Sequence, residues 1–311
     1  MRSRARVAGG ALAAALLGLG VWGSRAQRAD YGWRPHVRRP AFASTPLRVV
    51  VDEAHDNAST AGFAGRYWPF ARLLRADGCD VRRGKARFTA ESLSGIGLLV
   101  VANAAGAPKP QLFGINLPVR TERKRSDPAF TAGEIEALRT WVESGGALLL
   151  VADHAPFGAA ASGLAAAFGV RMHAGFVEVP GEVSDPLLFS AENRRLGDHP
   201  ILGGIGPGTE VRRVMTFTGQ SLDGPPGSTV LLRLPDTAVE AVPRGAGLAE
   251  ERAGEAQGLA FERGRGRVVV FGEAGMLTAQ VAEWEPFGMN IPGNDNAQLV
   301  LNVVRWLGKR L

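Results

Sequence analysis

The sequence predicts an α/β protein built on an open, doubly wound and mostly parallel sheet, with an antiparallel or mixed section added after about residue 170. Up to that point, short apolar runs alternate with amphipathic helical patterns. Beyond it, strand patterns joined by Gly and Pro turns dominate. The 311 residues are 45% hydrophobic and 21% charged, so the chain can bury a sizeable core.

The first part of the body alternates strand and helix. Residues 97–102 and 147–152 are continuous apolar runs, as is typical of strands buried on both faces of a parallel sheet. Thr131 and Glu134 form a capping box that opens the helix between these two strands. The other elements expected here are strands at 48–52 and 79–82 and helices at 64–76 and 162–168.

The later part of the body is rich in strand patterns. The strands expected there cover residues 211–217, 229–234, 258–261 and 267–271. An amphipathic helix at 297–307 ends the chain. We therefore expect one α/β domain over residues 47–311, with its antiparallel or mixed section in the second half.

The basic charge is concentrated at the N-terminus. The formal net charge is +6, but the first forty residues hold eight arginines and one aspartate, so the remaining chain is close to neutral. A near-neutral body lacks the extended positive surface that binds a phosphate backbone. We therefore expect no nucleic-acid partner.

The N-terminus resembles a targeting segment. Arg2, Arg4 and Arg6 precede an apolar run over 7–22, and Ser24–Ala26 offers a small-residue cleavage site. Residues 1–26 are thus predicted to be a signal peptide or an inner-membrane anchor, followed by an Arg/Pro linker over 27–46. We expect an exported, periplasmic or outward-facing protein, and a cytoplasm-facing anchor is the alternative.

Polar residues follow the predicted strands. In open α/β sheets, ligands bind beyond the carboxyl ends of the strands, so these residues are the candidate site. Carboxylates beside imidazoles suit acid–base chemistry or a divalent metal. The catalytic candidates are Asp153, His154 and Glu273, and a metal would use Asp52 and His154. The ligand-binding candidates are Asp52, Glu53, His55, Asn103, Asn294 and Asp295.

Each of these residues also has a structural interpretation. Asp and Asn after a strand commonly cap the turn or helix that follows. The sequence lacks a His-Glu-x-x-His motif, a Walker loop, a Gly-x-Gly-x-x-Gly after the first strand and a Gly-x-Ser-x-Gly elbow. Its single cysteine, Cys79, allows no internal disulfide and is expected to be a small buried residue.

Five motifs together resemble an uncharacterised bacterial family whose fold is thought to be that of class I glutamine amidotransferases. They lie at residues 50–55, 148–158, 216–220, 272–276 and 293–296. The resemblance covers about residues 47–308 and implies a flavodoxin-like sheet. Those amidotransferases use a cysteine nucleophile on the turn after a central strand. Here that turn carries Asp153 and His154, so thiolate-based glutaminase chemistry is not expected.

These observations give two hypotheses for function. In the first, an envelope-associated domain hydrolyses a polar, carbohydrate-like substrate with the Asp/His/Glu cleft, with or without a divalent metal. In the second, the same cleft binds a polar ligand or a protein of an envelope complex without catalysis. The carbohydrate-like substrate is an analogy from relatives of the fold.

Overall fold

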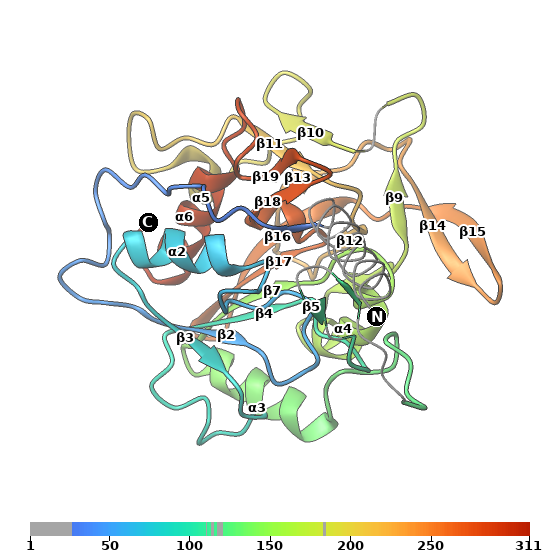
Figure 1. Ribbon diagram of the computed structural model, residues 1–311, viewed down its shortest axis with the longest axis horizontal. Helices are drawn as coiled ribbons and strands as arrows, with labels where there is room; N and C mark the ends of the chain where they lie inside the picture. Colours follow the sequence, from blue (N-terminus) through green and yellow to red (C-terminus); the bar gives the residue numbers. More distant parts are fainter. Residues whose placement is uncertain (1–26, 110, 113–114, 117–120, 183–184) are drawn as a thin grey trace, which may run out of the picture.

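The computed structural model describes residues 27–311 except 110, 113–114, 117–120 and 183–184 (Figure 1). Its centre is a mixed sheet, in which the described residues form nine strands. Five of these strands run parallel: β2 (Arg48–Asp52), β3 (Asp80–Gly84), β4 (Leu98–Ala102), β7 (Ala147–Val151) and β17 (Gly266–Phe271).

The parallel strands lie in the order β3-β2-β4-β7-β17. In chain order this is second, first, third, fourth and fifth, which is compatible with a flavodoxin-like core. All five residues of β4 and of β7 are buried, because helices or loops cover both faces of the sheet there. The expected α/β class is confirmed, and the large sheet is mixed: its parallel part is compatible with the expected flavodoxin-like core, whereas β16, β12, β8 and β13 join it antiparallel.

Antiparallel strands extend the sheet beyond β17. They are β16 (Ala256–Arg263), which pairs with β17, then β12 (Leu222–Asp223) and β8 (Arg171–Met172), while β13 (Thr229–Arg233) also pairs with β16. Two smaller sheets among the described residues have three strands each. One contains β1 (Arg28–Ala29), β18 (Ala279–Ala282) and β19 (Glu285–Gly288), and the other contains β9 (Phe176–Glu178), β14 (Val239–Arg244) and β15 (Gly247–Arg252). Two strand pairs are β10 (Leu187–Ser190) with β11 (Arg213–Thr216), and β5 (Gln111–Leu112) with β6 (Ile115–Asn116).

Helices cover the two faces of the parallel strands. One face packs against α2 (Trp68–Ala76) and α6 (Asn296–Leu307), and the other against α3 (Ala132–Glu143) and α4 (Phe157–Ala167). The short helices are α5 (Pro200–Gly203) and the 3₁₀ helix η1 (Gly275–Leu277). Thr131 and Glu134 cap α3 reciprocally, as the sequence predicts.

Some elements differ from the sequence prediction. Helix α2 begins at Trp68 because residues 60–67 form turns closed by the amides of Gly65 and Tyr67. Helix α4 begins at Phe157, earlier than expected, since its Ala-rich start is a strong helix former. The hairpin β14–β15 was not expected, because one of the buried positions of β14 is Glu240 and the side chains of β15 are exposed or half-buried, so the apolar alternation that marks a strand is missing.

Residues 27–46, expected to be a linker, instead pack on the domain. Strand β1 pairs with β18, and Phe42 is buried in the core beside α2 and α6. The buried pair Asp77–Arg305 holds the segment: the Asp77 carboxylate accepts the Ala41 amide, and Arg305 donates to the Arg39 carbonyl. A buried ion pair requires such additional hydrogen bonds, which the Pro/Arg composition does not reveal.

The expected targeting segment, residues 1–26, lies outside the described residues. Among the residues that are described, no helix is both long and apolar enough to span a bilayer.

Candidate functional site

Three neighbouring strand ends converge on one cavity. Asn103 follows β4, Asp153 and His154 follow β7, and Glu273 follows β17 by one glycine. The Asn103 amide donates to the Val151 carbonyl at 2.9 Å, and the Ala152 amide donates to the Phe271 carbonyl at 3.0 Å, so the three chains leave the sheet side by side. All four side chains line a cavity of about 450 Å³. The structure thus brings together four of the predicted site residues.

Asn103 ties two of these chains together. Its φ of 49° lies in the left-handed region, which asparagine tolerates better than most residues. Its Oδ1 accepts the Asp153 amide at 2.9 Å, and its Nδ2 donates to the hydroxyl of Ser59 at 3.2 Å. Since both ends of the amide side chain are used, Asn103 positions the turn that carries Asp153 and His154.

The Asp153–His154 turn fixes the tautomer of the imidazole. Nδ1 of His154 lies 2.7 Å from the Ala155 carbonyl, which can only accept, so Nδ1 carries the hydrogen. The Nε2 atom of the neutral ring then holds a lone pair, and no described residue hydrogen-bonds to it. The ring is stacked on Phe176 with centroids 4.7 Å apart. The imidazole is therefore oriented by its Nδ1 contact, and its Nε2 hydrogen-bonds to none of the residues that the structure describes.

Burial raises the pKa of Asp153. The imidazole of His154 when it is protonated, the hydrogen bond from the His154 amide at 2.8 Å and the charge of Arg66 act against this rise without cancelling it. The carboxyl group is therefore biased toward its protonated form compared with an aspartate in water.

Residues 216–220, in the segment between α4 and β17, support the turn that carries Asp153 and His154. Gln220 is fully buried; its Nε2 donates to the carbonyls of Ala152 and Asp153, and its Oε1 accepts the Ala174 amide. Gly158 makes room for it, because a Cβ there would lie 2.3 Å from the Gln220 side chain. The 216–220 motif thus stabilises the backbone of the turn that carries Asp153 and His154.

Glu273 is buried, and its carboxyl group interacts electrostatically with Asp153. Its oxygens accept the amides of Gly275 at 2.5 Å and Met276 at 2.8 Å, which stabilises the start of η1. Burial, followed by the negative charge of Asp153, raises its pKa well above the ordinary value. Glu273 therefore combines a structural role with a carboxyl group inclined to hold a proton.

Several lining residues were not predicted from the sequence, and two of them, Arg66 and Tyr67, interact electrostatically with Asp153. Arg66 and Tyr67 stand immediately before α2, and the Tyr67 hydroxyl donates to the Ala274 carbonyl at 3.2 Å. Burial lowers the pKa of Arg66, and Asp153 opposes that effect. The sequence shows a basic and an aromatic residue before the first helix, which are residue types that can line a polar cavity. Their spacing does not predict that they lie near Asp153.

The rest of the cavity wall mixes polar and aromatic groups. Gln280 is 2% exposed, and its Oε1 finds no hydrogen-bond partner among the described residues. An unpaired buried carbonyl oxygen costs free energy unless a ligand or water donates to it. The other polar residues on the wall are Gln27, Ser59, Asp185, Thr218, Thr278 and Glu283, and Phe157, Phe217 and Phe287 add aromatic surface.

Asp52 and His55 do not join this cavity. Nδ1 of His55 lies 2.8 Å from the Asp52 carboxylate and Nε2 lies 2.9 Å from Glu134, while Phe88 and Phe130 contact the ring at centroid distances of 4.5 and 4.6 Å. His55 is 1% exposed, so both of its nitrogens are used inside the protein. The arrangement links β2 to α3 and is structural.

The remaining candidates also serve the backbone. Glu53 accepts the Ala61 amide and pairs with Arg83. Asn294 donates to the carbonyls of Gly288 and Ile291, and Asp295 accepts the amides of Arg212 and Arg213. These three residues shape loops and are not on the cavity wall.

The expected metal pair is not assembled. Asp52 is bound to His55 and Asn57, whereas His154 faces the cavity. Among the described residues, no group of three or more His, Cys, Asp or Glu side chains is arranged to hold a metal ion.

Cys79 lies apart from the cavity, at the start of β3. Burial, with the nearby Asp77 carboxylate, raises the pKa of its thiol to about 12. A thiol of that pKa is almost entirely protonated at neutral pH and is not a thiolate nucleophile.

Comparison with known proteins identifies a fold. No family model matches the sequence, and no curated protein matches it. The N-terminal domain of mmIFT52 superposes with a TM-score of 0.55 at 14% identity, over 84% of this chain and 97% of that one. At this identity the likeness concerns the α/β fold alone.

Two further solved structures have lower scores. A ThuA-like protein from Bacteroides uniformis has a TM-score of 0.43 at 13% identity, over 89% of this chain and 95% of that one. A protein from Thermoplasma acidophilum described as a GMP synthase subunit also scores 0.43, at 12% identity, over 85% of this chain and 95% of that one.

The His55–Glu134 contact predicts a pH-dependent loss of stability. Burial would raise the pKa of Glu134, but hydrogen bonds from Thr131 and His55 outweigh it and lower the pKa to about 2. A lowered carboxyl pKa stabilises the fold above the ordinary value near 4.5, and this contribution is lost as the pH falls toward 2. E134Q should lower the free energy of unfolding at pH 7 by about 2–3 kcal/mol.

Urea denaturation from pH 7 to pH 3 measures this effect. The difference between wild type and E134Q should shrink as the pH falls. E136Q, an exposed change on the same helix, is the control and should have a smaller effect at pH 7. An equal loss for the two variants, or a gap that grows in acid, would contradict the structural role of Glu134.

The raised pKa of Asp153 predicts the opposite trend. A carboxyl whose pKa is raised on folding destabilises the protein as the pH rises through that pKa, because the folded state resists ionisation. D153N keeps an acceptor for the His154 amide and removes the charge. D153N should raise the free energy of unfolding at pH 8, and each kcal/mol of that increase should raise Tm by about 2–4 °C. Both increases should vanish near pH 4.

Thermal unfolding of D153N, wild type and the exposed control D236N over pH 4–8 tests this prediction. D236N should follow wild type throughout. A D153N protein that is less stable at pH 8, or one whose gain does not depend on pH, would show that Asp153 is not held in a site that disfavours its charge.

Proposed function

We propose that the cavity binds a polar, carbohydrate-like small molecule and hydrolyses it by acid–base chemistry. The observation that carries the proposal is the convergence of Asp153 and His154 on one cavity wall, with the imidazole acceptor nitrogen unused by the described residues and the carboxyl pKa raised by burial. A base and an acid with distinct environments, facing one cavity, are the minimum for hydrolysis.

The roles follow from the protonation states. His154 Nε2 takes a proton from a water molecule, whose oxygen attacks the electrophilic carbon of the substrate. The bond from that carbon to the leaving oxygen breaks, and the leaving oxygen takes the proton of the Asp153 carboxyl. Proton exchange with solvent returns His154 to the neutral state and Asp153 to the acid. Arg66 limits the charge that builds up on Asp153.

The substrate class is inferred from the wall. Hydroxyl, amide and carboxyl groups offer many hydrogen bonds, and Phe157, Phe217 and Phe287 offer apolar faces. The unpaired Oε1 of Gln280 would accept a hydroxyl hydrogen. Sugar rings combine hydroxyls with apolar faces, so they match both features. We include no thiol chemistry, because Cys79 is remote and protonated. We also retain the envelope location as part of the proposal, based on residues 1–26 of the sequence.

A non-catalytic binding domain is the second candidate. It is favoured by the carboxylates' bonds to the backbone, since Glu273 accepts two amides and Asp153 accepts one. In that case the same wall would recognise the ligand without turnover.

The test is a panel of oligosaccharides and amino sugars assayed both for binding, by calorimetry, and for turnover, by detection of new reducing ends. H154Q and D153N should each lower kcat by about 10²–10⁴-fold while changing Kd little. H173Q is the control, because His173 pairs with Asp223 away from this cavity. Wild-type kcat/KM should fall as the pH rises above the Asp153 pKa.

The outcomes separate the two candidates. Turnover that survives in both H154Q and D153N would overturn the assigned roles. Binding with no turnover in wild type would leave the binding domain as the function. A panel that shows neither binding nor turnover would reject the carbohydrate class.

A further inference from the structure

A second cavity, of about 470 Å³, lies on the face of the sheet that α3 and α4 otherwise cover. The connection from β3 to β4 contains turns and no helix, although doubly wound sheets usually have a crossover helix there. Val49 and Val51, on the opposite face of β2, are 0% exposed, whereas Val50 is only partly buried. The sheet therefore lacks cover over β2 and β3, and loop 85–97 encloses a hollow there.

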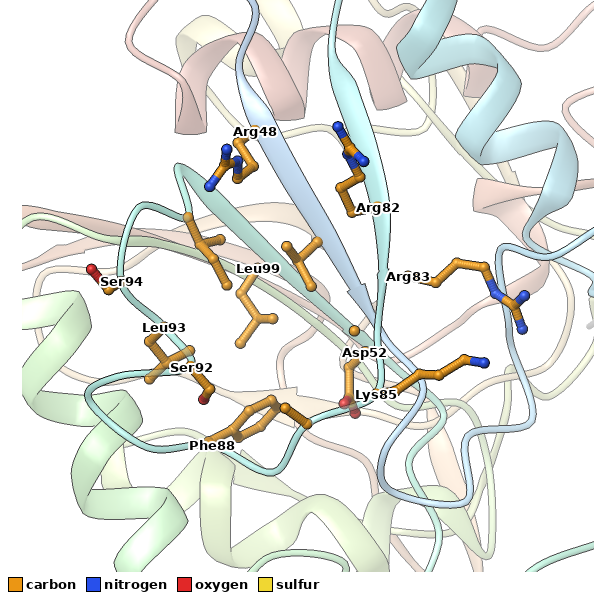
Figure 2. Close-up of a pocket in the computed structure, with 14 residues that line it drawn as sticks. Arg48, Asp52, Arg82, Arg83, Lys85, Phe88, Ser92, Leu93, Ser94 and Leu99 are labelled. Atoms are coloured by element: carbon orange, nitrogen blue, oxygen red, sulfur yellow. The ribbon is translucent and has the colours of Figure 1, made fainter.

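The hollow has an apolar wall. Leu99 projects from β4, and Phe88 and Leu93 project from loop 85–97 into the same hydrophobic cluster (Figure 2). Val50 and Ile96 complete this wall and pack against that cluster as partly buried side chains. Their remaining exposure is apolar surface that an apolar ligand group could cover.

Cationic groups stand at one end of this wall. Arg48 and Val50 alternate along β2, and Arg82 is the register partner of Val50 on β3, so both guanidinium groups belong to the cavity side of the sheet (Figure 2). Arg48 has no ion-pair partner among the described residues, and its guanidinium lies against Gly95. Arg82 pairs with Asp80 in an exposed contact, which contributes little.

The one acid on the wall does not neutralise them. Asp52 is 1% exposed, and its carboxylate already accepts from His55 and Asn57. Lys85 adds a further positive charge, and Arg83 is turned away toward Glu53. The cavity thus combines an apolar wall with an excess of positive charge at its rim.

We propose that this cavity binds a single-chain anionic amphiphile. Its acyl or alkyl chain lies on the partly exposed Val50 and Ile96, and its carboxylate or phosphate head contacts Arg48 and Arg82. Guanidinium groups bind both kinds of head through charge-assisted hydrogen bonds. The site does not depend on the chemistry proposed for Asp153 and His154.

Calorimetric titration of the full chain with laurate and with dodecyl phosphate, below their micelle concentrations, tests the proposal. Each should bind with one-to-one stoichiometry, and R48Q/R82Q should weaken binding by about tenfold or more. R171Q/R233Q is the control. It also removes two exposed arginines, which line another cavity and form exposed ion pairs, so this variant should bind like wild type. The tighter of the two ligands identifies the head group.

Head groups without a chain, a filled cavity and a variant of the first cavity provide three further tests. Acetate and inorganic phosphate alone should not bind, and V50W, which fills the hollow, should abolish binding of both amphiphiles. Equal affinity for wild type and R48Q/R82Q, an equal loss in R171Q/R233Q, or no binding to wild type would overturn the site. A loss caused by D153N instead would place the amphiphile in the first cavity and would also overturn it.

Discussion

The parallel pairing of β7 with β4 on one side and β17 on the other is the constraint on which the site depends. Its register sets Ala102 and Phe271 beside Val151, so the residues that follow all three strands emerge in one row. Asn103, Asp153 and Glu273 come from segments far apart in the sequence, yet they meet because their strands end together. The core around β7 therefore stabilises the fold and also sets the geometry of the cavity.

The long insertion between α4 and β17 supports the turn that follows β7. Gln220 reaches from this insertion to the carbonyls of Ala152 and Asp153, and Gln257 ties Thr216 to the Thr218 carbonyl. Both buried amide side chains also use their oxygens: Gln220 Oε1 accepts the Ala174 amide, and Gln257 Oε1 accepts the Thr216 hydroxyl. Such networks hold a turn in one conformation, because breaking any contact leaves a buried polar group unpaired. The insertion thus makes the Asp153–His154 turn rigid.

The α/β class was predictable from the sequence because β4, β7 and β17 are apolar runs and α3 begins with a capping box at Thr131. The site was predictable in part: Asn103, Asp153, His154 and Glu273 follow strands whose ends meet. The same rule failed for Asp52 and His55, since a sequence does not show that Glu134 arrives from α3 to occupy the second imidazole nitrogen. Arg66 and Tyr67 were missed because a loop, not a strand end, brings them to the cavity. The packing of residues 27–46 depends on the Asp77–Arg305 pair, whose members lie far apart in the chain.

The cavity holds carboxyl groups in surroundings that favour their protonated forms, beside an imidazole whose Nε2 hydrogen-bonds to none of the described residues. Carbon-13 NMR titration of the Asp and Glu carboxyl carbons, with D153N and E273Q used for assignment, measures this directly. We expect Asp153 and Glu273 to titrate above the ordinary range for their residue types, and the Glu273 midpoint to fall in D153N because the neighbouring charge is gone. Midpoints at or below the ordinary range, or a Glu273 midpoint that ignores D153N, would contradict this expectation.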